Sequence, residues 1–269
     1  LLLPLRELHQ LPQDKRLVAP RELAENNSKN EARLEVGSWK LEVGSWKCEF
    51  RGGSWKFEAM TTLSLIVPCY NEQEGLPKLW SVLEELARMI EPTYRWEMVL
   101  VDDGSTDGTG ELLETFCRTH PRARVLHHPR NRGLGAALRT GFAEARGELI
   151  ATIDSDCTYD PRELPSMLQL MTPDVDLVIA SPYHPQGGVT NVPRYRLFLS
   201  HNLSRLYAWV TGSRLYTYTS LFRLYRASVL YAVRFESDGF LAMSQILVGA
   251  LANGARVAAV TCVQHLAVD

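Results

Sequence analysis

From Thr62 onward, short apolar runs rich in β-branched residues alternate with segments in which apolar residues recur at helical spacing. This alternation is typical of a mostly parallel β-sheet with helices on both faces, so we predict an α/β fold. Ligands of such sheets bind at the carboxyl ends of the strands. The expected strands are 63–67, 97–101, 124–127, 149–153 and 176–180, and the expected helices are 75–90, 109–119, 134–146 and 161–171.

Residues 1–59 differ in character from the rest of the chain. The heptapeptide LEVGSWK occupies positions 34–40 and recurs at 41–47, and a degenerate third copy ends at Lys56. A heptad coiled coil is disfavoured, because Gly and Ser recur in every copy and weaken a helix. We predict that 1–59 is disordered or a non-native extension, and that 60–269 is one folded domain.

Composition and charge exclude several classes of function. The formal net charge is only -2, so no overall positive field attracts nucleic acid. The five cysteines are scattered and form no CxxC pair, which argues against zinc and fits a reducing cytoplasm. The apolar stretch 240–263 is interrupted by Gln245, Asn253 and Arg256, so we predict no transmembrane helix.

Two carboxylates follow the expected strand at 149–153. Asp154 and Asp156 are two residues apart, and side chains at that spacing point the same way in an extended chain. Like charges this close repel unless one carboxyl group is protonated or a cation lies between them. Oxygen ligands of this kind favour Mg²⁺ or Mn²⁺, which complete their shells with water and substrate phosphates. The pattern therefore indicates a metal-bound diphosphate.

Two alternative interpretations of the acidic segments stay open at this point. The first is a surface turn in which Asp160 caps the helix that begins near Pro161. The second is a calcium-binding EF-hand loop at 103–114, where the acidic residues and a glycine have the required spacing. An EF-hand loop follows a helix, whereas 97–102 is a strand-like apolar run, so we expect the match to be a coincidence.

Motifs in this order resemble those of the family 2 glycosyltransferases of GT-A fold, and within them the dolichol-phosphate mannosyltransferase-like branch. The motifs are IVPCYNE at 66–72, VDDGSTDGT at 101–109, NRGLGAA at 131–137 and DSD at 154–156. The resemblance implies a GT-A type, Rossmann-like sheet and a metal-dependent transfer of sugar from a nucleoside-diphosphate sugar. It covers about 63–180 well and the remainder loosely.

The resemblance also implies roles for individual residues. The metal and diphosphate would be held by Asp154 and Asp156. Gly133 and Gly135 begin a helix, so we expect their N–H groups to face phosphate oxygens. Strand-end carboxylates suit ribose hydroxyls, as in dinucleotide-binding folds. The base and ribose would be held by Pro68, Tyr70, Glu72 and one of the pair Asp102 and Asp103.

By the same resemblance, the second half of the chain carries the acceptor side. Arg196 and Arg223 are candidate clamps for an acceptor phosphate, since arginine presents a bidentate donor fork, and Arg223 is also a candidate catalytic residue. Ordinary surface ion pairing is the alternative. Segment 194–210 places an apolar stripe with interspersed arginines on one helical face. We expect this stripe to pack on the core, with peripheral contact at a membrane surface as the alternative.

Three features depart from the family pattern and leave impaired catalysis open. Pro182 stands where many relatives have Arg, which removes a cation that would meet the diphosphate. Gln245 stands where a late helix of relatives usually carries Glu, and an amide cannot act as a carboxylate. The chain ends at Asp269, before the basic tail that often follows in relatives, which suggests a C-terminal truncation.

The expected reaction is a single inverting displacement in which the metal stabilises charge on the departing nucleoside diphosphate. A polyprenyl or dolichyl phosphate acceptor is ionised near neutrality and needs no general base, whereas a sugar hydroxyl needs one. The alternatives are a non-catalytic nucleotide-sugar-binding homologue and a nucleotidyltransferase. A Rossmann dehydrogenase is disfavoured, because no Gly-x-Gly-x-x-Gly follows the first strand. We expect a cytoplasmic protein, with any membrane contact peripheral at the cytoplasmic face.

Overall fold

The structure is a computed structural model that describes residues 39–43, 46–51, 54–183, 188–190, 194–213 and 215–265. The chain divides into two compact units, and the second takes in residues 58–269. None of the helices in the described ranges is long and apolar enough to cross a membrane.

Part of the N-terminal segment forms a three-stranded sheet of order β1-β2-β3. Its strands are β1 (Trp39–Val43), β2 (Trp46–Arg51) and β3 (Ser54–Ala59). Disorder of residues 1–59 stays a prediction, but these strands have a reason in the sequence. The reason is a second period inside the repeat, since apolar and charged residues alternate in WKLEV and WKCEFR, as in a strand. Residues 1–38 lie outside the described residues, and a non-native origin of the segment stays a prediction.

The second unit is built on a seven-stranded sheet of order β11-β8-β10-β7-β4-β5-β6. The pairs β4–β5, β4–β7, β5–β6 and β8–β11 are parallel, so the expected mostly parallel sheet is confirmed. Each of the five predicted strands is present within two residues of its expected bounds. The strands are β4 (Thr62–Cys69), β5 (Arg95–Asp102), β6 (Ala123–His127), β7 (Leu149–Thr152), β8 (Leu177–Ser181), β10 (Arg223–Arg226) and β11 (Val257–Thr261).

Strand β10 was not predicted. It lies between β7 and β8 and is antiparallel to both. Its sequence, RLYR, is short and carries an arginine at each end, so nothing in it indicates a central strand. Strand β10 is buried because β7 and β8 lie on either side of it, and the sequence of β10 alone does not indicate these neighbours.

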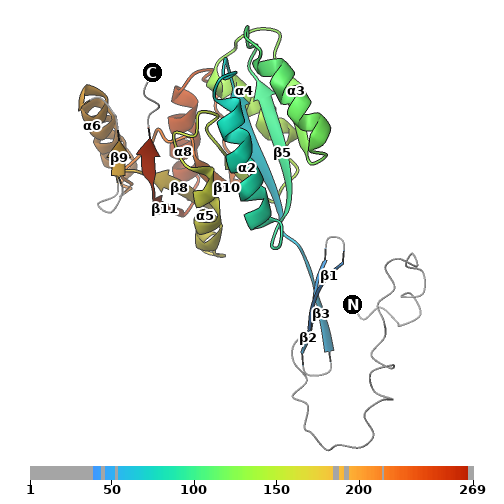
Figure 1. The fold of residues 1–269 in the computed structure, drawn as a ribbon. Coiled ribbons are helices and arrows are strands. Elements are labelled where there is room, and N and C mark those ends of the chain that lie inside the picture. Colours follow the sequence, from blue (N-terminus) through green and yellow to red (C-terminus); the bar gives the residue numbers. More distant parts are fainter. Residues whose placement is uncertain are drawn as a thin grey trace, which may run out of the picture. The chain divides into compact units, whose positions relative to one another are not determined.

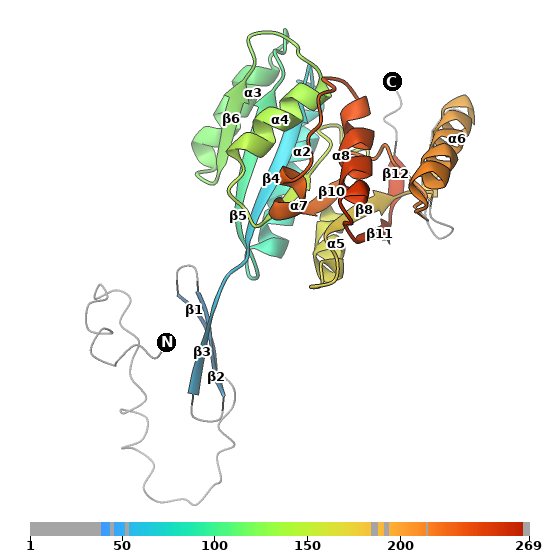
Figure 2. The ribbon, with the colours of Figure 1, turned by 180° about the vertical axis from the view of Figure 1, so that it is seen from behind.

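Helices cover both faces of the sheet (Figures 1 and 2). Leu65 and Val67 belong to the core beneath α2, α3 and α5, whereas Ile66 belongs to the core beneath α4 and α8. This alternation along β4 is the two-sided burial expected of a central parallel strand. The helices are α2 (Leu76–Ile90), α3 (Thr109–Thr119), α4 (Leu134–Glu144), α5 (Leu164–Leu170) after the short 3₁₀ helix η3 (Pro161–Glu163), α7 (Ala227–Tyr231) and α8 (Leu241–Ala252).

Three further elements lie outside the seven-stranded sheet. Helix α6 (Arg194–Thr211) contacts α8, and β9 (Gly188–Thr190) pairs in parallel with β12 (Val263–His265). Helix α6 lies at the edge of the domain (Figure 1), where Tyr207 and Ala208 pack against the core beneath α4 and α8.

Candidate functional site

The acidic motifs meet at the carboxyl edge of the sheet because their strands are neighbours. Strand β4 pairs with β5 up to Cys69 opposite Asp102, and with β7 up to Ile66 opposite Thr152. The loops that follow β4, β5 and β7 therefore emerge side by side. This is the convergence that the sequence led us to expect.

The loops after β4 and β5 are tied to each other by hydrogen bonds. The N–H of Asn71 donates to Ser105 Oγ at 3.0 Å, and the N–H of Glu72 donates to Thr109 Oγ1 at 2.8 Å. Asn71 has a φ of 53°, which Asn tolerates better than most residues. The two loops form one rim, from which the side chain of Tyr70 is exposed, whereas Pro68 is buried inside β4.

Asp103 is held by the motif at 131–137. Its Oδ1 accepts from the N–H of Arg132 at 3.0 Å, and its Oδ2 accepts from the N–H of Gly133 at 2.7 Å. His128 Nδ1 also lies 2.6 Å from Oδ1, and the other ring nitrogen of His128 lies 2.8 Å from Thr140 Oγ1. Both carboxylate oxygens are thus occupied by the chain itself. Asp103 is therefore an anchor between two loops, and its predicted contact with the ribose stays a prediction.

Asp102 is occupied in the same way. Its Oδ1 accepts from the N–H of Ser105 at 3.0 Å, and its Oδ2 lies 2.9 Å from His127 Nδ1. Burial alone would raise the pKa of Asp102, but the hydrogen bonds from Ser105 and His127 outweigh it and lower the pKa. His127, the last residue of β6, and His128 after it are therefore part of the site's framework, and the sequence analysis did not identify them.

The N–H groups of Gly133 and Gly135 are not available to phosphate, contrary to our expectation. That of Gly133 donates to Asp103, and that of Gly135 donates to the carbonyl oxygen of Asp238 at 2.6 Å. A Cβ at Gly135 would overlap the carbonyl oxygen of Ser237, and Gly133 has a φ of 93°. These glycines allow the turn before α8 to pack against the start of α4.

Three carboxylates lie in the loops after β4 and β7, namely Glu72, Asp154 and Asp156. Asp154 Oδ2 is buried and has no hydrogen-bond partner among the described residues. Burial, followed by the charges of Asp156 and Glu72, raises the pKa of Asp154 to about 8. The pKa of Glu72 is also raised, by burial and then by Asp156, although a hydrogen bond with Ser155 opposes this. The structure therefore places Glu72 next to the Asp154–Asp156 pair.

This acidic cluster fits a divalent cation. A buried carboxylate oxygen without a partner is stabilised by a cation, which would also remove the repulsion among the three carboxylates. Within the described ranges, no group of three or more His, Cys, Asp or Glu side chains is arranged to hold a metal ion by itself. Protein ligands would therefore form only part of the shell, as is usual for Mg²⁺ with a bound phosphate.

The structure also decides the two alternative interpretations of the acidic segments. Asp160 does cap η3, since its Oδ1 accepts from the N–H of Arg162 at 2.9 Å, so the turn exists beside the acidic cluster. The EF-hand is excluded, because strand β5 precedes the loop and both oxygens of Asp107 accept from backbone N–H groups of Thr109 and Gln73.

Arg223 lies in the core rather than at the acceptor side. It has no exposed surface, and its guanidinium donates to the carbonyl oxygens of Met243 at 2.6 Å and Tyr218 at 2.7 Å. A phosphate has no access to it in this arrangement, so the predicted clamp and catalytic role are not supported. Arg196 lies in α6, but its side chain is outside the described residues, and its predicted role stays a prediction.

Gln245 is an anchor for the turn before α8. Its Oε1 accepts from the N–H of Glu236 at 3.2 Å and of Ser237 at 3.0 Å. A carboxylate oxygen would accept the same two bonds, so a Gln or a Glu at this position serves the same structural purpose. The side chain of Pro182 is buried after β8. The departure at Gln245 therefore no longer argues against catalysis.

A protein-family model matches most of the second unit. The model described as glycosyl transferase family 2 matches residues 64–234, which is more than half of the chain. The chain belongs to this family. The match includes β4, β5, β7 and the loops that form the acidic cluster, and it ends before α8.

Several characterised proteins are similar to this family 2 chain. A dodecaprenyl-phosphate galacturonate synthase of Rhizobium johnstonii is 40% identical over 119 residues, 44% of this chain and 35% of that protein. A dolichol-phosphate mannosyltransferase of Pyrococcus furiosus is 32% identical over 51% of this chain and 38% of its own length. A polyprenol monophosphomannose synthase of Mycolicibacterium smegmatis is 35% identical over 55% of each. The chain thus spans about half or less of these relatives.

Solved structures support the GT-A fold. Glucosyl-3-phosphoglycerate synthase from Mycobacterium tuberculosis, in complex with Mn²⁺, UDP and glucosyl-3-phosphoglycerate, matches with a TM-score of 0.58 at 20% identity. The match covers 76% of this chain and 71% of that chain. At this identity, the similarity establishes the fold of the family 2 domain but not its ligands.

The apolar stripe of α6 does not pack on the core of the family 2 domain, and our preferred interpretation of it was wrong. Leu206 is 55% exposed, Trp209 82% and Val210 66%. Leu206 and Val210 belong to the predicted stripe, and Trp209 lies beside it. The face of α6 that packs on the core carries Tyr207 and Ala208 instead, and helical periodicity alone did not distinguish the two faces. Exposed Arg205 lies among them, and α6 contains no acidic residue.

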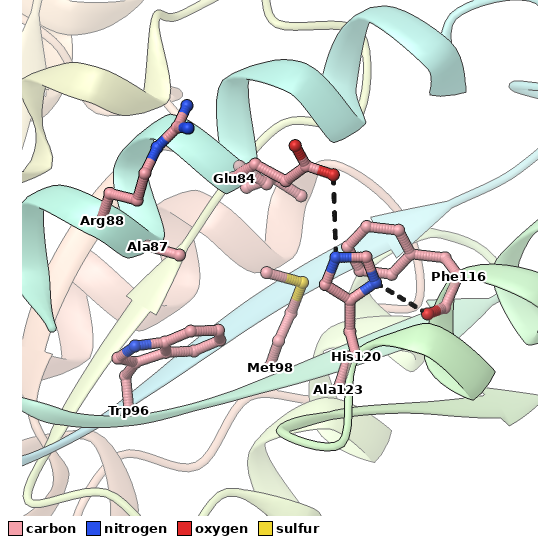
Figure 3. A pocket seen from close by; sticks show the side chains of 9 residues that line it. Glu84, Ala87, Arg88, Trp96, Met98, Phe116, His120 and Ala123 are labelled. Atoms are coloured by element: carbon pink, nitrogen blue, oxygen red, sulfur yellow. Dashed lines mark hydrogen bonds and ion pairs between the residues drawn. The ribbon is translucent and has the colours of Figure 1, made fainter.

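A cavity of about 260 Å³ lies between α2 and α3, away from the carboxyl edge (Figure 3). Trp96, Met98 and Phe116 line it, and His120 lies at its rim, 3.7 Å from Glu84. None of the four family motifs contributes a side chain to its lining. The cavity is therefore separate from the candidate site.

The packing at Gly135 gives a prediction about stability. Replacement of Gly135 by Ala should lower the free energy of unfolding by about 1–3 kcal/mol, because the added Cβ overlaps Ser237 and forces the turn away from α4. Gly239 is the matched control, since nothing lies within 4 Å of an added Cβ there. Denaturant unfolding compares the two variants. Equal stability of Gly135→Ala and Gly239→Ala would contradict the close packing.

The raised pKa of Asp154 gives a prediction about pH. Without metal, unfolded Asp154 ionises near pH 4, whereas the folded protein keeps its proton up to about pH 8. The folded state therefore loses stability as pH rises through this window. Asp154→Asn should be more stable than the wild type at pH 8 by about 5 kcal/mol, and the difference should vanish near pH 4. Unfolding curves in EDTA test this, and a difference independent of pH would refute it.

Proposed function

We propose that residues 60–269 form a catalytic domain that transfers a sugar from a nucleoside-diphosphate sugar to a polyprenyl or dolichyl phosphate, with inversion and with Mg²⁺ or Mn²⁺. The observation that carries the proposal is the buried, unpartnered Oδ2 of Asp154 beside Asp156 and Glu72 at the carboxyl edge. The names of the similar proteins support the lipid-phosphate acceptor. The Mn²⁺ and UDP of the M. tuberculosis enzyme support the metal and the donor class.

Different residues at the carboxyl edge would bind different parts of the donor. Asp154 and Asp156 would hold the ion. Glu72 would lie near them, since it forms a hydrogen bond with Ser155. A bound divalent ion supplies stabilisation of the negative charge on the departing diphosphate. The exposed ring of Tyr70 on the rim offers a surface for the base. Asp103 keeps the rim in place through its bonds to Arg132 and Gly133.

The acceptor chemistry needs no general base from the chain. A monoester phosphate has a second pKa of about 6 and is ionised at neutral pH, so its oxygen attacks directly. Gln245 cannot take a proton, and it is already committed to two backbone N–H groups. A sugar hydroxyl would require a base at this position. A lipid phosphate therefore suits this chain better than a hydroxyl acceptor.

Helix α6 is the candidate for peripheral contact with the cytoplasmic face of a membrane. Leu206, Trp209 and Val210 are exposed on a helix with arginines and no acidic residue. Apolar side chains and cations of this kind bind the interface of an anionic bilayer. Contact there would bring the domain to its lipid substrate.

The α6 contact predicts a loss of vesicle binding. Replacement of both Leu206 and Trp209 by Ser should reduce cosedimentation with vesicles containing anionic phospholipid by about tenfold, because each side chain contributes apolar burial. Met89→Ser on α2 removes a similarly exposed apolar side chain and should have no effect. Equal binding of all three proteins would remove α6 as the contact.

The metal role predicts loss of transfer. Asp154→Asn and Asp156→Asn should each lower turnover about 100-fold or more, since the charge on the departing diphosphate loses its stabilisation. Asp160→Asn is the matched control, because Asn also caps a helix and this residue serves η3. The assay follows labelled sugar from a panel of nucleoside-diphosphate sugars to a polyprenyl phosphate, with Mn²⁺, Mg²⁺ or EDTA. Unchanged turnover in both variants would refute the proposal.

The same assay separates the alternatives. Nucleoside-diphosphate binding by calorimetry without any transfer would favour a non-catalytic homologue, as the missing cation at Pro182 allows. Pyrophosphate release from a nucleoside triphosphate would favour a nucleotidyltransferase. Transfer to a polyprenyl phosphate excludes both.

A further inference from the structure

The carboxylate of Asp156 is held by one residue, Thr158. The N–H of Thr158 donates to Asp156 Oδ1 at 2.7 Å, and Thr158 Oγ1 donates to Asp156 Oδ2 at 2.6 Å. Among the described residues, Thr158 supplies both hydrogen bonds that this carboxylate accepts. Asp156 is itself exposed, so packing does not fix its side chain. The orientation of the carboxylate therefore depends on Thr158.

Thr158 is in turn fixed by the core on both sides. Its side chain is buried, and its neighbours Cys157 and Tyr159 belong to the core beneath α2, α3 and α5. The ring of Tyr159 lies beside that of Phe222, with centroids 6.3 Å apart. Cys157 has a φ of 54°, which residues other than Gly rarely adopt, and this turn brings the N–H of Thr158 back to Asp156. The two donors are thus presented by an anchored backbone.

The position of the Asp156 charge affects both neighbouring acids. After burial, the charge of Asp156 is the largest influence that raises the pKa of Asp154, and the same holds for the pKa of Glu72. Asp156 therefore lies close to both groups. If its carboxylate turned away into water, the solvent would screen its charge, and it would no longer act on a cation together with the buried oxygen of Asp154.

We propose that Thr158 is a positioning residue, whose N–H and hydroxyl hold Asp156 in the orientation in which Asp156 and Asp154 bind the divalent ion. The inference rests on the proposed function and adds a residue to its metal site. A group that hydrogen-bonds a ligating carboxylate sets the orientation of that ligand, and its loss lowers metal affinity by about 10- to 100-fold. Thr158 acts through Asp156 and needs no contact of its own with the ion or the donor.

The test removes the hydroxyl and keeps the volume of the side chain. Thr158→Val should raise the Kd for Mn²⁺ about tenfold or more, because Asp156 keeps only one of its two donors. Thr158→Ser keeps the hydroxyl and should bind Mn²⁺ as the wild type does. Electron paramagnetic resonance of free Mn²⁺ measures binding to the full chain without nucleotide. In the transfer assay, the Mn²⁺ concentration for half-maximal rate should rise in Thr158→Val, while the KM for the acceptor stays unchanged.

Two controls separate positioning from a general loss of packing. Thr152→Val is matched to Thr158→Val, because Thr152 is also buried and its hydroxyl donates to the carbonyl oxygen of Leu221 at 2.5 Å. It should leave Mn²⁺ binding unchanged, even where it lowers the free energy of unfolding. Added to Asp156→Asn, Thr158→Val should change the Kd for Mn²⁺ by less than about twofold, since the residue it acts through is already altered. Thr158→Ala gives the same comparisons if Thr158→Val does not fold.

The outcomes distinguish this inference from the proposed function. Wild-type transfer with Mn²⁺, together with an unchanged Kd for Mn²⁺ in Thr158→Val, would overturn the inference alone. Equal losses of Mn²⁺ binding in Thr158→Val, Thr158→Ser and Thr152→Val would also overturn it, because the cause would then be packing. A wild-type protein that binds no Mn²⁺ and transfers sugar in EDTA would contradict the metal in the proposed function itself.

Discussion

The carboxylate of Asp103 joins segments that are far apart in the sequence. One of its oxygens accepts from the N–H of Arg132 and lies beside His128, and the other accepts from the N–H of Gly133. Because Asp103 is buried, these bonds are made where an unpaired carboxylate would be costly. The loop after β5 is therefore bonded to the start of α4. The turn before α8 packs against the start of α4 at Gly135. The arrangement of loops at the carboxyl edge of the sheet depends on these bonds of Asp103.

Asp154 shows the opposite condition. The framework carboxylates Asp102 and Asp103 have partners for both oxygens, whereas Asp154 has a buried oxygen with none among the described residues. The fold thus gives each oxygen of Asp102 and Asp103 a partner and leaves one buried oxygen of Asp154 without one in the described part of the chain. Natural proteins retain an unsatisfied buried group mainly where a ligand satisfies it. The contrast singles out Asp154 alone, since both oxygens of Asp156 accept from Thr158. It supports our proposal that Asp154 faces the ligand.

The sequence was sufficient for the strands whose apolar runs are buried on both faces, such as β4 and β5, because that burial is visible as a local pattern. It also identified which loops would meet. It was insufficient wherever a role depends on a partner from elsewhere in the chain. Arg223 carries the residue type of a phosphate clamp, and only the position of β10 between β7 and β8 buries it. The N–H of Gly135 looks free at a helix start, and its acceptor, Asp238, comes from a distant turn.

Gln245 illustrates how a departure from a family pattern is weighed. Read as a lost carboxylate, it argues for lost catalysis. In the structure its oxygen accepts hydrogen bonds from two backbone N–H groups of the turn before α8. Gln and Glu both have such an acceptor oxygen, so these bonds do not need the negative charge of Glu. A hydroxyl acceptor would need the charge as a base, but an ionised phosphate would not. The substitution is therefore compatible with catalysis on a phosphate acceptor, and a base at position 245 is required only in an enzyme that activates a hydroxyl.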